Sequence, residues 1–197
     1  MGLARTLSRG QAGIDAYLVT VEVHIAGGLP GFAVTGLPAP AVRESKDRVR
    51  AALATSGYKI PPSRITVHLG PADIPKTGGR FDLAIALGVL LADQEKPWPV
   101  DRIEFLGELA LNGELRPFNG ALPAALAAQQ AGHAIVLPAA NAAEAALLTG
   151  AEVYTAAHLN DVIRHLRGEQ PLPRVVPCRD SFSAGAGPDL ADVRGQT

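Results

Sequence analysis

The strongest constraint on the fold is a run of ten residues, 83–92, that contains no charged side chain. The run is about half as long as the roughly 20 residues that a membrane-crossing helix needs, so it does not predict a transmembrane segment. Because the run is apolar almost all round, it predicts a helix that is buried on most sides. We expect this helix to form the centre of the core, and we expect no membrane partner.

Size and composition set the remaining limits. A chain of 197 residues with 47% apolar residues is enough for one globular domain and a tail. No apolar segment follows Arg5 and Arg9, so a secretory signal is not indicated and a cytoplasmic location is expected. Cys178 is the only cysteine, which excludes an internal disulfide and a multi-thiolate zinc site. The five histidines show no metal-ligand spacing, so we expect no metal in this chain.

The first half of the chain predicts strands followed by a helix. Apolar and polar residues alternate over residues 19–25, which predicts a half-buried strand, and residues 3–8 are expected to pair with it in an antiparallel hairpin. A short strand is expected at 32–35, a helix over 40–56 and another strand at 65–69.

The second half predicts alternating helices and strands. A strand over 103–111 ends at Asn112-Gly113, a strong two-residue hairpin signal. Beyond it, helices are expected at 121–131, 141–148 and 159–166, with strands at 134–137 and 152–154. The chain then becomes rich in Pro, Gly and Ser. We therefore expect an α/β (α+β) domain over residues 1–168, with a mixed sheet packed with helices, and a flexible linker over 169–197.

The charge distribution is uneven. Residues 41–80 hold eight Lys or Arg and three Asp or Glu, whereas the rest of the chain is net acidic. A basic segment of this kind can follow a phosphate backbone, and aromatic residues do not alternate with its basic residues, which argues against base stacking. The candidate DNA-binding residues are Arg43, Lys46, Arg50, Arg64, Lys76 and Arg80.

An ion-paired, solvated helix face explains part of the same segment equally well. Asp47 lies among the basic residues of the expected helix, and Glu44 stands four residues before Arg48. The sequence therefore leaves open whether this face binds DNA or is simply solvated.

The loop over residues 70–79 stands where a phosphate-binding loop would stand, between a strand and a helix. Pro75 occupies the position that needs a glycine N–H, so the loop does not match that motif. Lys76 and Arg80 at the start of the helix could still attract an anion. The simpler alternative is a tight turn in which Thr77 caps the helix and Asp82 complements its dipole.

Several stretches of the chain closely resemble one bacterial family, the Mg-chelatase-like AAA+ proteins of the ComM/YifB type. These stretches are residues 18–25, 28–31, 36–38, 42–50, 71–76, 78–83, 107–113 and 189–196. The resemblance implies that the chain is an N-terminal domain with a Lon-protease-like, two-layer fold. It also implies that the ATPase module, with its ATP and Mg²⁺, lies downstream of Thr197, so no cofactor is expected in this fragment.

The same resemblance bears on catalysis, because Lon-type proteases use a serine and a lysine. The positions that correspond to them here are Arg80 and Leu122. A guanidinium cannot be acylated as a serine can, and a leucine cannot accept a proton. The fragment is therefore expected to have no catalytic residues.

The function implied by the resemblance is that of a ring-forming motor, expected to be a hexamer, which moves branched DNA and supports recombination in natural transformation. This domain would contact branched or single-stranded DNA or organise the ring. The alternative is a subunit-assembly or regulatory module that makes no contact with DNA. A cryptic hydrolase is the third possibility.

Overall fold

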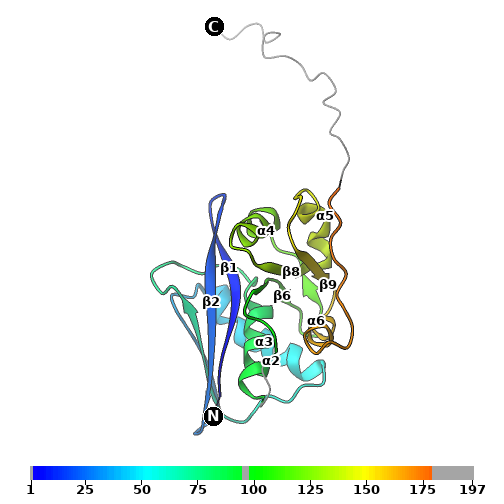
Figure 1. The fold of residues 1–197 in the computed structure, drawn as a ribbon. Coiled ribbons are helices and arrows are strands. Elements are labelled where there is room, and N and C mark those ends of the chain that lie inside the picture. Colours follow the sequence, from blue (N-terminus) through cyan, green and yellow to red (C-terminus); the bar gives the residue numbers. More distant parts are fainter. Residues whose placement is uncertain (1, 95–97, 179–197) are drawn as a thin grey trace, which may run out of the picture.

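The computed structural model describes residues 2–94 and 98–178, and one seven-stranded mixed sheet organises them in the order β3-β4-β2-β1-β5-β8-β9 (Figure 1). The strands of this sheet are β1 (Gly2–Ala12), β2 (Asp15–Ala26), β3 (Gly31–Thr35), β4 (Arg64–Gly70), β5 (Ile103–Phe105), β8 (Ala134–Pro138) and β9 (Val153–Ala156). The helices are α1 (Pro40–Arg43), α2 (Ser45–Thr55), α3 (Asp82–Ala92), α4 (Ala121–Gln130), α5 (Ala142–Ala145) and α6 (Leu159–Leu166), and η1 (Ala139–Asn141) is a short 3-10 turn.

The expected N-terminal hairpin is confirmed and is longer than predicted. Strands β1 and β2 pair antiparallel from Gly2 opposite Ile25 to Ala12 opposite Asp15. Strand β2 also pairs antiparallel with β4, and β3 runs parallel to β4. The strands β5, β8 and β9 run parallel to one another. Alternate residues of β2 from Val19 onward are buried, as the period of two predicts.

Helix α3 is the centre of the core, as its composition predicts. All eleven of its residues are buried, and it packs on β1 and β2. Gly88 allows this close packing, because a Cβ at that position would lie 2.6 Å from Cγ2 of Val23. The Thr6 hydroxyl donates to the Ala84 carbonyl oxygen at 2.9 Å, which satisfies a buried polar group against the helix. None of the described helices is long and apolar enough to cross a membrane.

Helices cover the two halves of the sheet differently. In β8, Val136 packs in the core formed with α2, α3 and α6, whereas Ile135 and Leu137 pack on the other face with α4. On β2, by contrast, the outward side chains of Glu22 and His24 are exposed. The mixed α/β class is confirmed. The predicted two-layer arrangement describes β3, β4 and the C-terminal part of β2, whereas helices pack on both faces of β8 and α4 also covers Ala16 at the start of β2.

The segment expected to be one strand over 103–111 divides in two. Strand β5 ends at Phe105, and β6 (Glu108–Leu109) pairs with β7 (Leu115–Arg116) in a separate ribbon. The cause lies at Gly107, whose N–H donates to the Arg80 carbonyl at 2.9 Å and whose carbonyl accepts from Leu83 at 3.1 Å. The backbone of Gly107 is therefore bonded to the start of α3. The hairpin expected at Asn112-Gly113 is confirmed as the β6–β7 pair, with a three-residue loop over 111–113, since the Ala110 N–H donates to the Glu114 carbonyl at 2.9 Å.

The chain continues to pack on the domain after α6. Residues 169–178, here called the strap, run back along β9. The Thr155 N–H donates to the Pro173 carbonyl at 3.0 Å, and the Val175 N–H donates to the Val153 carbonyl at 2.8 Å. Leu172 is buried in the main core. The folded part thus reaches at least residue 178, ten residues past the predicted end of the domain. Residues 179–197 of the linker predicted over 169–197, and with them the family stretch at 189–196, lie outside the described residues.

A histidine connects the strap to α6 and makes the domain sensitive to acid. His165 Nδ1 accepts a hydrogen bond from the Leu172 N–H at 3.1 Å, and burial lowers the pKa of the His165 imidazole. A lowered pKa means that the unfolded chain binds the proton first as the pH falls through the ordinary histidine range, near 6.5. We therefore expect the free energy of unfolding to fall between pH 7.5 and pH 5.5.

Urea unfolding at these two pH values measures the effect. The His165→Asn variant keeps an acceptor oxygen but cannot titrate, so it should show a smaller loss of stability on acidification. An unchanged pH dependence in this variant would contradict the assignment to His165.

Candidate nucleic-acid interface

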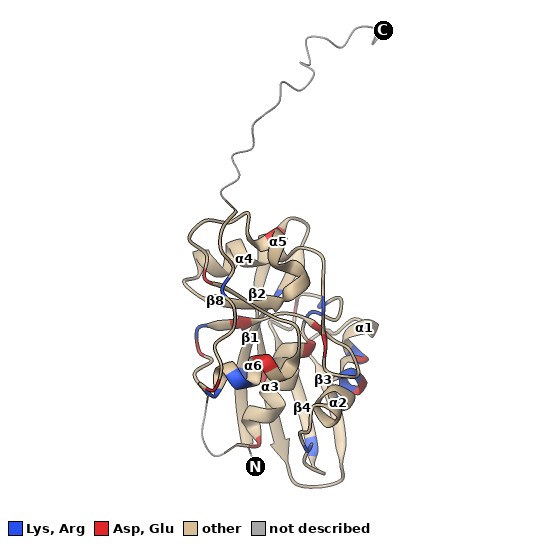
Figure 2. Ribbon diagram, turned by 90° about the vertical axis from the view of Figure 1, so that its right-hand side faces the viewer, with Lys and Arg blue, Asp and Glu red and all other residues tan. Residues whose placement is uncertain are grey.

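Three of the predicted basic residues share one exposed face of α1 and α2. Arg43, Lys46 and Arg50 are all exposed, and we call them the basic stripe. The opposite side of these helices is buried through Val42, Ser45, Val49, Ala52 and Leu53. The helical period thus turns the three cations away from the core. Figure 2 shows basic and acidic residues mixed on α1 and α2.

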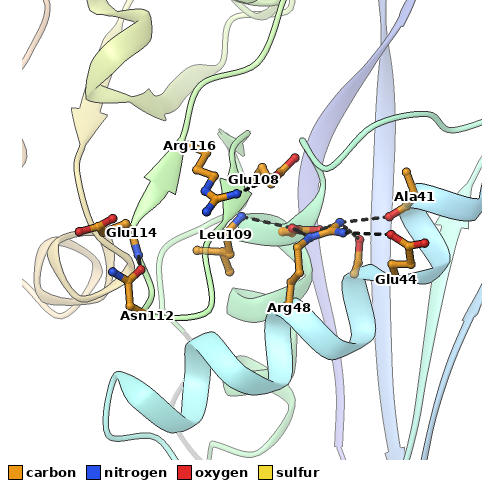
Figure 3. Close-up of polar contacts among 10 residues, drawn as sticks. Ala41, Glu44, Arg48, Glu108, Leu109, Asn112, Glu114 and Arg116 are labelled. Carbon is orange, nitrogen blue, oxygen red and sulfur yellow. Dashed lines mark hydrogen bonds and ion pairs between the residues drawn. The ribbon is translucent and has the colours of Figure 1, made fainter.

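A buried ion pair anchors the stripe to the core. On α2, Arg48 Nε lies 2.7 Å from Asp82 Oδ2, and Arg48 Nη2 donates to Asp82 Oδ1 at 3.1 Å. The same Nη2 donates to the Ala41 carbonyl at 3.1 Å, which holds α1 against α2 (Figure 3). The Glu44 carboxylate, the partner expected from sequence, is exposed and reaches Arg48 Nη1 only at 3.9 Å. Asp82 is therefore the main partner of Arg48.

The electrostatics of this pair follow from its burial. Asp82 is fully buried at the start of α3, and its Oδ2 also accepts from the Leu109 N–H at 3.2 Å. Burial raises the pKa of the Asp82 carboxyl, while the hydrogen bond from Arg48 opposes that shift. The same hydrogen bond raises the pKa of Arg48. The guanidinium of Arg48 is thus bonded to Asp82 and is not available to bind a ligand.

Arg64 does not join the stripe. It opens β4, where Ile65, Val67 and Leu69 face the helices and are fully buried. Because successive strand residues point to opposite faces, Arg64 belongs to the face of the sheet away from α2. It is exposed, but the sheet separates it from the basic stripe.

Lys76 and Arg80 do not offer an exposed cationic surface, and a contact of either with DNA stays a prediction. Lys76 is buried, and its amine donates to the Pro71 carbonyl, so it closes its own loop. Burial lowers the pKa of the Lys76 amine. Arg80 is 9% exposed and donates from Nη2 to Gln11 Oε1 at 2.9 Å and to the Asn119 carbonyl at 3.0 Å. Thr77 does not cap α3, which begins at Asp82 after Phe81.

The two positions that the resemblance assigns to the Lon dyad, Arg80 and Leu122, lie near each other. The Asn119 carbonyl that binds Arg80 stands three residues before Leu122, the second residue of α4. The Leu122 N–H donates to Glu144 Oε1 at 2.8 Å. Neither side chain can serve as a nucleophile or as a base. That these positions are the vestige of a protease site stays a prediction.

Sequence reasoning missed the surroundings of Arg80. Gln11, Tyr17, Phe118 and Asn119 come from distant parts of the chain, and no motif links them. Within the described ranges, no group of three or more His, Cys, Asp or Glu side chains has metal-binding geometry.

Comparison with known proteins identifies the family. The sequence profile described as subunit ChlI of Mg-chelatase matches residues 21–141. The chain is 45% identical over its whole length to the competence protein ComM of Haemophilus influenzae, of which it covers 40%. It is 43% identical to the YifB protein of Salmonella typhimurium, of which it covers 39%.

A more distant similarity supports the fold. About half of the chain, 49%, aligns with Lon protease 2 of Bacillus subtilis at 33% identity, covering 17% of that protein. The chain thus spans about 40% of the length of its ComM and YifB relatives. On these findings, the chain belongs to the Mg-chelatase ChlI-like family and is a homologue of ComM and YifB.

Proposed function

We propose that this domain is a non-catalytic, DNA-contacting part of a ComM-type motor. In this proposal, a separate AAA+ module binds ATP and Mg²⁺ and drives branch migration in the cytoplasm. The protein supports recombination of incoming DNA and acts as a hexameric ring. The name of the relative ComM, a competence protein, supports the link to DNA uptake.

The observation that carries the proposal is the basic stripe. Arg43, Lys46 and Arg50 are exposed, lie on one helical face and form no ion pair with another described residue. Free cations at helical spacing can follow the phosphates of a strand without reading its bases. Asp47 belongs to the same exposed surface and lowers its net positive charge. We therefore assign to the stripe a weak, salt-sensitive contact with the DNA backbone.

The test is the salt dependence of DNA affinity. Neutralising the stripe with Arg43→Gln, Lys46→Gln and Arg50→Gln should reduce the slope of log Kobs against log salt by about 2.7 for duplex DNA, because three phosphate contacts are lost. Fluorescence anisotropy with duplex and forked DNA, between low and physiological salt, measures it.

The matched control is a triple variant of exposed arginines elsewhere on the surface, Arg102→Gln, Arg164→Gln and Arg174→Gln. It carries the same change in net charge, so its salt slope should stay close to that of the unmodified chain. Equal losses in the two triple variants would show a general charge effect and would contradict a stripe-specific contact.

A second function, subunit assembly without DNA contact, is favoured by two exposed apolar loop tips. Ile14, at the turn between β1 and β2, is 88% exposed, and Leu29, before β3, is 90% exposed. Large apolar side chains displayed in this way are typical of protein contacts. If this function holds, Ile14→Ser and Leu29→Ser should change the sedimentation of the full-length protein and leave its DNA affinity unchanged.

A further inference from the structure

Arg80 differs from the other shielded arginines of the domain in having no acidic partner. Arg9 is paired with Glu104 at 2.6 Å, and Arg48 is paired with Asp82 at 2.7 Å. Among the described residues, no carboxylate lies within ion-pair distance of Arg80, although its side chain is nine-tenths buried. Burying a charge without a counter-charge lowers the folding stability of a protein by roughly several kcal/mol. A separate role for this cation is therefore needed to explain it.

The guanidinium also has unused hydrogen-bonding capacity. Nη2 donates to Gln11 Oε1 and to the Asn119 carbonyl, whereas Nη1 is buried without any hydrogen-bond partner. The Phe118 ring lies 5.0 Å from the guanidinium carbon and covers one of its faces. Burial lowers the pKa of Arg80, as expected for a cation held away from water. An oxyanion would supply both the missing charge and the missing acceptor.

Gln11 occupies the place next to Arg80 that such an anion would need. Its amide lies against Gly120, where a Cβ would lie 2.5 Å from Gln11 Oε1. Gln11 stands near the end of the β1–β2 hairpin and is half-buried, held otherwise by a hydrogen bond from its Nε2 to the Gly13 carbonyl at 3.0 Å. Rotation of this side chain toward solvent needs no change in the core. The neutral amide oxygen of Gln11 can thus give way to a charged oxygen.

The chemistry of Arg80 suits a phosphate. Lys76, in the same loop, is a second buried cation whose amine bonds only to a carbonyl, that of Pro71. The Tyr17 hydroxyl donates to the Pro75 carbonyl at 2.9 Å, next to Lys76 in the chain. Burial raises the pKa of Tyr17, and the nearby charge of Arg80 opposes that shift. Asp73 opposes the lowering of the Lys76 pKa, so Lys76 has an acidic neighbour, whereas Arg80 has none among the described residues. A phosphate offers several acceptor oxygens to this one guanidinium.

We propose that Arg80 is a phosphate-binding residue gated by Gln11. The phosphate oxygens accept from Nη1 of Arg80 after the Gln11 amide has turned away, and the absence of a side chain at Gly120 leaves room for them. Glu144 already accepts from the Leu122 N–H, so the ligand binds on the Arg80 side and not at the start of α4. This site is distinct from the basic stripe and does not depend on the function proposed for it.

Titration of the 197-residue chain with inorganic phosphate, at ionic strength held constant with NaCl, tests the proposal by calorimetry and by the shift in Tm. The unmodified chain should bind phosphate saturably. Gln11→Ala should bind about tenfold more tightly, because the anion no longer displaces a hydrogen bond to a charged group. Arg80→Met should lose the response and, without phosphate, should have a raised Tm, because the unpaired buried charge is gone.

The control is Arg116→Met, which removes an exposed arginine and should leave phosphate binding unchanged. It also separates binding from the general stabilisation that phosphate gives by exclusion from the surface, which all variants share. An equal phosphate response in Arg80→Met, or weaker binding in Gln11→Ala, would overturn the proposal.

A second arm identifies the source of the phosphate. A single-stranded DNA oligonucleotide is added to the chain in which the basic stripe has been neutralised. Loss of the phosphate response in its presence assigns the site to the nucleic-acid backbone, and an unchanged response assigns it to free phosphate. Either result supports a phosphate site at Arg80, and neither depends on the stripe.

Discussion

The Glu104→Gln variant is expected to lose about 3–5 kcal/mol of unfolding free energy, because it leaves a buried arginine without its counter-charge. Arg9 Nε and Nη2 donate to the two oxygens of Glu104 at 2.6 and 2.7 Å, and Glu104 is fully buried. His133 Nδ1 lies 2.7 Å from the same carboxylate. Glutamine keeps the shape of the side chain but removes its charge. Urea unfolding of the variant measures the loss.

A double variant distinguishes the effect of the unpaired charge from the effect of lost packing. Arg9→Met combined with Glu104→Leu removes both charges, so it should lose much less stability than Glu104→Gln alone. If the double variant is as unstable as the single one, the loss comes from packing and the ion pair is not its cause.

The Gly36→Ala variant is expected to lose about 2–5 kcal/mol, for two physical reasons that add. Gly36 has φ +93°, in the left-handed region that costs other residues about 1–2 kcal/mol. A Cβ there would also collide with the backbone carbonyl of Leu69 on β4, which cannot rotate away, and such overpacking costs about 1–3 kcal/mol. Thermal or urea unfolding measures the sum.

Gly57→Ala provides the matched control. Gly57 has a similar φ, +90°, but nothing lies within 4 Å of the position of its Cβ. It should therefore lose only the conformational part, about 1–2 kcal/mol. Equal losses at the two glycines would show that the contact with β4 contributes nothing. Gly36 joins β3 to α1, which carries part of the basic stripe. The backbone shift that relieves the collision at Gly36→Ala would therefore also displace the stripe.

The elements with a strong periodic pattern could be predicted from the sequence, since one physical effect determines each of them. Burial on all sides determines α3, and alternation determines β2. The division of the strand expected at 103–111 could not be predicted. It depends on hydrogen bonds between Gly107 and the start of α3, about 25 residues away in the chain, and no local pattern reports such bonds.

The candidate site was predicted only in part, because a count of charges does not say where they point. The helical period placed Arg43, Lys46 and Arg50 correctly on one face. The alternation of β4 could also have placed Arg64 on the opposite face of the sheet, since Ile65, Val67 and Leu69 are plainly its buried residues. Lys76 and Arg80 lie in a loop without a period, so their burial could be known only from the three-dimensional structure.

The docked strap is the first part of the domain to respond when the chain is pulled from its C-terminal side. A load on the chain beyond Cys178, directed away from the sheet, breaks the strap's backbone bonds one after another, first the one from Cys178 to Ala146 and then the one from Val175 to Val153. Sequential rupture needs less force than breaking all the bonds together. Complete detachment releases ten residues, or roughly 35 Å of extended chain. The part of the strap beyond Leu172 thus lengthens first, and the hydrophobic core carries load only when Leu172 is pulled from it.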